Sequence, residues 1–129
     1  MVHPTSGLLR QKIGRHRSAL RTRLSKFADL RLSTPGHDSG ALASLFNELR
    51  DLSSDISSYT DKLDTAVTDW RALISSCEPN DAYEEAAMLT TWLDASDDSP
   101  GINDELADAQ SALTSIAAQM AALDQQHRA

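Results

Sequence analysis

Hydrophobic residues recur at steps of three and four along most of the chain, which is the spacing of one face of an α-helix. The longest series runs without interruption from Leu42 to Cys77. It predicts one long helix over residues 41–77, whose other faces are rich in Ser, Thr and Asp and are expected to be solvated. The members of this heptad-like stripe are Leu42, Leu45, Leu49, Leu52, Ile56, Tyr59, Leu63, Ala66, Trp70, Leu73 and Cys77.

A shorter series precedes it and predicts a helix over residues 5–32. The series is interrupted where His16 or Arg17 would continue the apolar face. We expect an amphipathic helix whose apolar stripe is directed to a core, with basic residues on both sides of the stripe. Its apolar members are Leu9, Ile13, Leu20, Leu24, Phe27 and Leu30.

Two further helices are expected after the long one, over residues 82–95 and 100–126. In the first of them Asp81 is placed as the N-cap, and a glutamate three positions later completes a capping-box arrangement. In the second, Ser99 serves as the cap and Pro100 occupies the first turn, where a proline loses no hydrogen bond. The apolar positions of this last helix are Ile102, Leu106, Ala109, Leu113, Ile116, Met120 and Leu123.

Clusters of turn-forming residues separate these segments, at residues 33–40, 78–81 and 96–101. Connections this short favour antiparallel neighbours. The pattern therefore predicts an all-α fold: an elongated antiparallel helical bundle of about four helices, coiled-coil-like along its longest seams. The third helix is expected to act as a side brace or as a kinked prelude to the fourth.

Composition and charge refine this picture. Aromatic residues make up 5% of the 129 residues and there are only five Gly, which disfavours a β-sandwich or a barrel. The formal net charge of −7 is unevenly distributed, because residues 1–32 contain eight Lys or Arg and one Asp and the rest of the chain carries −14. We expect a single domain over residues 1–129, in which a basic first helix (5–32) is joined to an acidic helical remainder (41–126).

The basic residues of the first helix flank its apolar stripe in two rows and form a candidate interaction surface. Two interpretations stay open: the rows pack against the acidic helices, or they bind RNA or DNA with an affinity that falls as salt rises. Only Phe27 among these residues could stack on a base, and no recognised nucleic-acid-binding motif is present. The candidate residues are Arg10, Lys12, Arg15, Arg17, Arg21, Arg23 and Lys26.

Residues that would carry catalysis or bind a metal ion are scattered. The four His lie in separate places, no His-x-x-x-His or Glu-x-x-His pattern occurs, and the five Gly stand singly. Cys77 is the only cysteine and lies next to Glu78, so we expect a buried structural thiol. Helix capping and solubility explain the acidic pairs Glu84-Glu85, Asp97-Asp98 and Asp104-Glu105. We therefore predict no catalytic residue, no metal site and no cofactor, and a protein that is not an enzyme.

The long apolar seams are either the core of the bundle or an interface with another molecule. Heptad-like positions favour core packing for Trp70 and Trp92, although Trp92 and Leu93 are adjacent and cannot both point the same way. We expect a non-enzymatic interaction or assembly module that binds itself or another helical protein. The seam candidates are Leu45, Leu49, Leu52, Ile56, Tyr59, Leu63, Trp70 and Trp92.

The location of the protein is also an expectation from sequence. No run approaches the roughly 18–20 apolar residues that a membrane span requires, and the first residues match neither a signal peptide nor a myristoylation site. A single cysteine fits a reducing compartment. We expect an intracellular protein, most simply a cytoplasmic one, with no membrane span and no small-molecule substrate.

Three segments carry a resemblance to a known family. They are residues 20–27 (LRTRLSKF), 63–74 (LDTAVTDWRALI) and 81–85 (DAYEE), the last followed by Trp92-Leu93. In this order they resemble the amino-terminal helical region of Gag-like polyproteins of BEL/Pao-type LTR retrotransposons, over residues 8–123. The resemblance implies a structural, self-associating module related to particle assembly. It transfers no functional residue, because the shared pattern consists of packing positions.

Overall fold

The computed structural model describes residues 6–32, 39–96 and 99–128. They form four α-helices, and the expectation of an all-α helical bundle is confirmed. Outside the helices, the only pairing with strand geometry in these residues is an isolated bridge between Ser96 and Ser99. The helices are α1 (Gly7–Leu32), α2 (Ser39–Ser76), α3 (Pro79–Leu93) and α4 (Ile102–Arg128).

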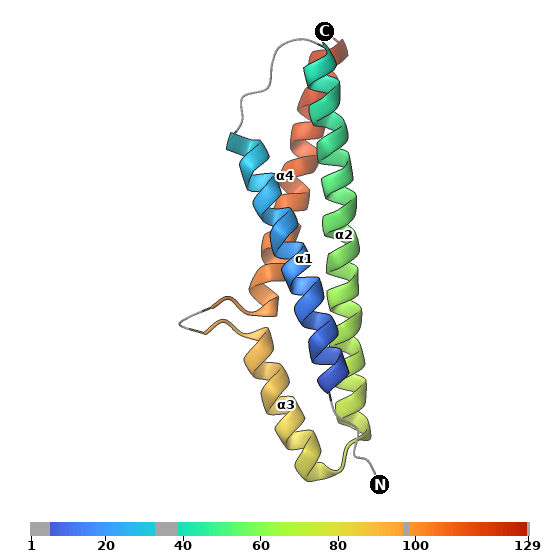
Figure 1. Cartoon of the computed structure of the whole chain (residues 1–129), viewed down its shortest axis with the longest axis vertical. Coiled ribbons are helices and arrows are strands. Elements are labelled where there is room, and N and C mark those ends of the chain that lie inside the picture. The colour runs from blue at the N-terminus through green and yellow to red at the C-terminus, as the bar shows by residue number, and fades with distance from the viewer. Residues whose placement is uncertain (1–5, 33–38, 97–98, 129) are drawn as a thin grey trace.

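The bundle is elongated, and its axis is set by α2 (Figure 1). α1 runs antiparallel to α2 and packs against it, forming a helical hairpin. α3 and α4 follow one another along this hairpin, α3 beside the C-terminal half of α2 and α4 beside its N-terminal half (Figure 1). The third helix is thus an interrupted prelude to the fourth, and together they form the third column of the bundle.

The predicted stripes meet in a continuous core. Burying each large side chain of this core contributes roughly 1.5–3 kcal/mol before conformational entropy is subtracted. Val67 is buried although it lies beside the predicted stripe of α2, because α2 contacts the first helix on one side and the third column on the other. The buried hydrophobic residues are Ile13, Leu20, Phe27, Leu49, Leu52, Ile56, Leu63, Ala66, Val67, Trp70, Leu89, Ile102, Ala109, Ala112, Ile116 and Leu123.

The ends of the first two helices differ little from those predicted. α1 begins at Gly7 and ends at Leu32, as expected at its C-terminus, whereas residue 5 lies outside the described residues. α2 begins at Ser39, two residues earlier than predicted. It ends one residue early, because the Cys77 N–H bonds to the carbonyl of Ile74 in a tighter turn.

The predicted start of the third helix was wrong. Asp81 is not the N-cap but lies in the first turn of α3, which begins at Pro79 after an extended Glu78. The physical reason is the proline, whose fixed φ and missing N–H suit the first helical position. The helix ends at Leu93 rather than residue 95, where Asp94 turns to an extended conformation.

The predicted start of the fourth helix was also wrong. Pro100 and Ser99 lie outside α4, which begins at Ile102 and continues to Arg128 rather than to residue 126. The first helical bond runs from the N–H of Glu105 to the carbonyl of Gly101, and the Asp104 carboxylate accepts a bond from the Gly101 N–H at 3.1 Å. The cap is therefore the backbone of Gly101, held by a side chain of the first turn. None of the described helices combines the length and the hydrophobicity that crossing a bilayer requires.

Candidate interaction site

The interruption in the apolar stripe of α1 marks a buried ion pair. Arg17 reaches across to α4, where its guanidinium bonds to Glu105 Oε1 and to the carbonyl oxygen of Pro100, the latter at 3.1 Å. Arg21 lies one turn further on, with its Nε 3.5 Å from Glu105 Oε2. The side chain of Glu105 is 3% exposed, so the expectation that this residue serves capping and solubility was wrong. Its neighbour Asp104 does cap the helix.

Glu105 depends on these arginines. A carboxylate removed from water is stable in its charged form only when it is paired, and removing one partner of a buried pair typically costs about 3–5 kcal/mol. Glu105 Oε2 is buried and has no hydrogen bond within accepted geometry, so Arg21 compensates its charge at longer range. The pair therefore fixes which face of α4 meets α1 and tolerates little change on either side.

A second carboxylate, half-buried, connects helices at the other end of the bundle. Glu85 of α3 accepts a hydrogen bond from the Trp70 indole N–H at 2.8 Å and further bonds from the hydroxyl and backbone N–H of Ser6, the fully buried residue that precedes α1. Arg10 donates to the Ser6 hydroxyl at 2.9 Å. An anion is favoured at this position because the first turn of α1 has unsatisfied N–H groups.

These contacts set the charge state of Glu85. Partial burial raises the pKa of its carboxyl group, but the hydrogen bonds from Ser6 and Trp70 and the nearby charge of Arg10 act in the opposite direction. The net result is a pKa below its ordinary value. Glu85 is therefore ionised at neutral pH and links α1, α2 and α3.

The two tryptophans pack against each other beside this carboxylate. Trp70 is fully buried, and its ring meets that of Trp92 edge to face with a centroid distance of 5.7 Å. Trp92 and Leu93 are both half-buried, which resolves their adjacency by placing each on one flank of α3. The core interpretation of Trp70 is confirmed.

Basic side chains of α1 and α2 gather around Tyr59 of α2. Arg23 pairs with Asp55 at 3.1 Å and lies over the ring of Tyr59, with its guanidinium carbon 5.8 Å from the centroid. Lys62 also lies over this ring, at 5.0 Å. The half-buried His16 is near the same ring, and its pKa is lowered by burial and then by the positive charges of neighbours that include Lys62.

The predicted basic surface thus consists of two groups of residues, those with partners in the bundle and those that remain exposed. Of its seven residues, Arg10, Arg17, Arg21 and Arg23 bond to or pair with other parts of the bundle. The remaining three are exposed and form no ion pair within the part of the chain that the structure describes: Lys12, Arg15 and Lys26. Lys12 lines a hollow between α1 and α2 together with acidic residues, so this face has mixed charge.

The seam candidates are placed mainly in the core. Five of them are buried, namely Leu49, Leu52, Ile56, Leu63 and Trp70. The other three are half-buried and pack against the core: Leu45, Tyr59 and Trp92. The central part of the long seam is therefore occupied by the chain's own helices.

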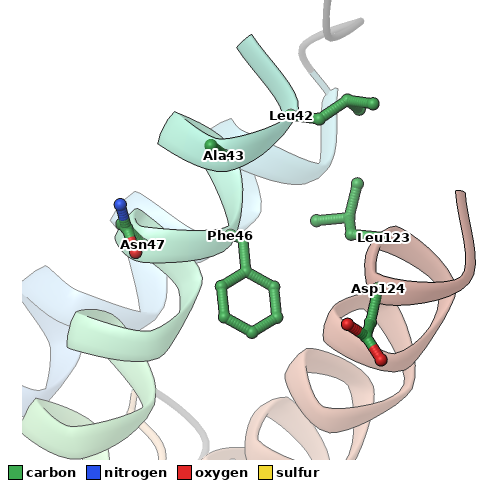
Figure 2. A pocket seen from close by; sticks show the side chains of 6 residues that line it. All are labelled: Leu42, Ala43, Phe46, Asn47, Leu123 and Asp124. Atoms are coloured by element: carbon green, nitrogen blue, oxygen red, sulfur yellow. The ribbon is translucent and has the colours of Figure 1, made fainter. Parts of the chain in front are cut away.

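Apolar side chains remain accessible where the seams end. An apolar groove of about 190 Å³ lies between the first turns of α2 and the last turns of α4. Figure 2 shows the ring of Phe46 between the two helices, opposite Leu123 and Asp124, with Leu42 above it. The groove is lined by Leu42, Ala43, Phe46, Asn47, Leu123 and Asp124.

Phe46 is not among the residues of the predicted stripes. Leu42 and Leu123 are the outermost members of the stripes predicted for α2 and α4, whereas Phe46 lies off the stripe of its helix. A large aromatic residue next to a heptad stripe is the signal that could have found it, because such a residue widens the apolar face beyond what one neighbouring helix covers.

The surroundings of Cys77 disfavour reactivity, and the described residues form no metal site. Cys77 is half-buried, so the expectation of a fully buried thiol was wrong: it follows the last turn of α2, at the end of the bundle. Its thiol donates to the carbonyl of Leu73 at 3.2 Å, and its pKa is raised by desolvation and by the charges of Glu85 and Asp81. A raised pKa keeps the thiol protonated and weakly nucleophilic. Within residues 6–32, 39–96 and 99–128, no group of three or more His, Cys, Asp or Glu is arranged to hold a metal ion.

Comparison with known proteins adds no assignment to this geometry. No protein-family model, curated protein or solved structure matches the chain.

Proposed function

We propose that this protein is a non-enzymatic helical module for protein–protein interaction and assembly. The proposal is supported by the positions of the polar side chains. Glu105, Glu85 and Arg17 form contacts between helices, and none of them lines the apolar groove. In the part of the chain that the structure describes, an apolar groove between the first turns of α2 and the last turns of α4 is left for a partner.

The apolar groove is the proposed docking site, and its proposed occupant is the apolar face of a basic amphipathic helix from a partner protein. A helix laid in a groove inserts apolar side chains at i, i+3 or i+4, and Phe46 and Leu123 supply the apolar walls for them. The charge of the partner follows from complementarity. The groove lies between α2 and α4, and both helices carry more Asp and Glu than Lys and Arg.

The experiment that tests this is a binding titration with a defined probe. The probe is a fluorescein-labelled synthetic peptide of Leu, Ala and Lys in which Leu recurs at helical spacing. We expect the Phe46→Glu variant to bind it at least tenfold more weakly than the wild type, measured by fluorescence anisotropy. The added negative charge would by itself favour a cationic peptide, so weaker binding reports the lost apolar contact.

Ser58→Glu provides the matched control. Ser58 is exposed on α2 outside the groove, and the substitution adds the same charge to the same helix. Its affinity for the peptide should equal that of the wild type, and circular dichroism should report the same helix content for both variants. Equal binding by the Phe46 and Ser58 variants would remove the groove from consideration as the docking site.

The Gag-like assignment is a more specific form of the same proposal. Its support is the helix order, the charge split between residues 1–32 and the rest of the chain, and the quoted segments. It requires that copies of the chain associate into particles or other regular assemblies. Light scattering coupled to size-exclusion chromatography, at low and at high salt, decides this point: a monomer at both salt concentrations would reject it.

Nucleic-acid binding is the alternative function. Its support is the exposed set Lys12, Arg15 and Lys26, together with the positive charges that lower the pKa of His16. The involvement of Arg17 in a buried pair weakens it. Replacing the peptide by single-stranded RNA in the same titration separates the two functions, because RNA binding at low salt that weakens steeply with added salt would favour this alternative.

A further inference from the structure

We propose that residues 79–128, the C-terminal arm formed by α3 and α4, exchange between two copies of this chain. In the exchanged dimer each arm packs on the α1–α2 hairpin of the other copy. The partner is thus a second copy of the same chain, and the surface is the hairpin face that the chain's own arm covers in the monomer. The apolar groove lies at one edge of this contact between α2 and α4. Its proposed occupant is a helix of another protein, whereas exchange uses the chain's own arm, so the inference goes beyond the proposed function.

The contacts between hairpin and arm do not depend on the two being in one chain. Glu105 of the arm pairs with Arg17 of the hairpin, and Glu85 bonds to Trp70 at the other end. Trp92 packs edge to face on Trp70. An arm from a second copy can form all of these contacts with the same geometry, which is the condition for domain exchange.

The connection between hairpin and arm is short and not helical. Only Cys77 and Glu78 separate α2 from α3, and Glu78 is extended with φ −61° and ψ 153°. Pro79 has no N–H to continue the hydrogen-bonding of α2, so the connection remains a hinge in any arrangement of the two helices. Changing a few backbone dihedrals at Cys77 and Glu78 redirects the whole arm.

The charge distribution selects this pairing over others. α1 contains eight Lys or Arg and one Asp, whereas residues 79–128 contain ten Asp or Glu and one Arg. Two arms repel each other, and so do two first helices, but each first helix attracts an arm of either copy. Whether the arm closes on its own hairpin or on another therefore depends on protein concentration.

A mixture of two charge-reversed variants tests the exchange. In Arg17→Glu alone and in Glu105→Arg alone, the buried pair is mismatched within each chain. Mixed in equal amounts, the two variants form two matched pairs only when the arms exchange. We expect a 1:1 dimer, measured by light scattering after chromatography and by native mass spectrometry, that melts about 5–10 °C above either variant alone.

Two controls accompany the mixture. The double variant Arg17→Glu/Glu105→Arg restores the reversed pair within one chain and reports whether that pair is tolerated in the bundle. Arg15→Glu mixed with Glu105→Arg should give no stabilised dimer, because Arg15 is exposed and forms no ion pair in the described part of the chain. If the double variant folds but the mixture remains monomeric and melts as its components, exchange is rejected.

A second experiment uses wild-type chains, in case the double variant with the reversed pair does not fold. Two populations, one lengthened by an amino-terminal tag, are unfolded together and refolded at increasing total concentration. A share of mixed dimers that rises with concentration is expected for exchange, as for any association of two copies, and the absence of mixed dimers at every concentration overturns exchange. Phe46 is left unchanged in these experiments, because it lies on the contact between α2 and α4. The charge-reversed mixture separates exchange from a dimer held by the apolar groove, because only exchange forms matched pairs between the two chains.

Discussion

At the scale of single residues, two pairs of sequence neighbours show that similar acidic side chains take different roles in the fold. Asp104 caps the start of α4 while Glu105 is buried against arginines. In the other pair Glu84 is exposed while Glu85 bonds to Trp70. Neighbouring positions on a helix face different directions, so only one member of each pair is directed towards another helix. That member, buried at Glu105 and half-buried at Glu85, forms a specific helix–helix contact.

Glu85→Gln should reduce stability, and the loss should depend on pH. The carboxylate accepts from Trp70 and Ser6, and hydrogen bonds to a charged group contribute about 1.5–3 kcal/mol in favourable cases. Because the folded-state pKa is lowered, this stabilisation is fully present above about pH 4.5 and is lost as pH falls through the folded-state pKa. Urea unfolding at neutral pH and at about pH 3 should show a gap between wild type and variant that narrows in acid.

Glu84→Gln is the matched control for this prediction. It makes the same chemical change one residue away, at an exposed position of α3. Its free energy of unfolding should stay within about 0.5 kcal/mol of the wild type at both pH values. A gap for Glu85→Gln that stays constant between neutral and acidic pH would show that the charge of Glu85 does not contribute.

At the scale of elements, the third column is broken because α4 starts against the end of α3. A Cβ atom added to Gly101 would overlap backbone atoms of Leu93 and Asp94, 2.6 Å from the Asp94 carbonyl oxygen. The close approach of two backbones therefore requires glycine at this position. The same approach places Glu105 one turn into α4, where Arg17 meets it.

Substituting alanine at two glycines should have opposite effects. Gly101→Ala is expected to destabilise the protein by about 1–3 kcal/mol, because the backbone of residues 93–94 must move. Gly14 lies inside α1 with no neighbouring atom within 4 Å of an added Cβ, so Gly14→Ala should stabilise by about 0.5–1 kcal/mol through helix propensity. Thermal and urea unfolding measure both, and a neutral Gly101→Ala would contradict the close approach.

At the scale of the whole molecule, burial is unevenly distributed. α2 has buried residues from Leu49 to Trp70 and contacts the other three helices. α3 has one buried residue, Leu89, and its further attachment depends on Glu85 and Trp92. Segments with few buried apolar contacts open locally at lower free energy than the global unfolding reaction.

Hydrogen–deuterium exchange should follow this distribution. Amides in the centre of α3 are expected to exchange about tenfold faster or more than those between Leu49 and Trp70 of α2. Mass spectrometry of peptides after quenched exchange gives the comparison within a single sample. Protection of α3 equal to that of α2 would mean that the Glu85 contacts hold α3 more firmly than its burial indicates.

The sequence by itself determined the helices and most of the core. Periodicity at steps of three and four is a local property, so the four helices followed from it, as did the buried positions of α2 from Leu49 to Trp70 except Val67. The ends of the helices were predicted less accurately. Pro79 sets the start of α3 and the close backbone approach at Gly101 sets the start of α4, and the spacing of apolar residues contains neither effect.

Only the tertiary structure decided what the polar residues do. Glu105 and Glu85 resemble capping acids in the sequence, and Arg17 resembles Arg15, yet burial depends on which helix lies opposite. The groove at Phe46 likewise exists only because the ends of α2 and α4 lie side by side. Spacing along one helix specifies a face, whereas the partner of that face is set by long-range packing, and charge alone does not identify it.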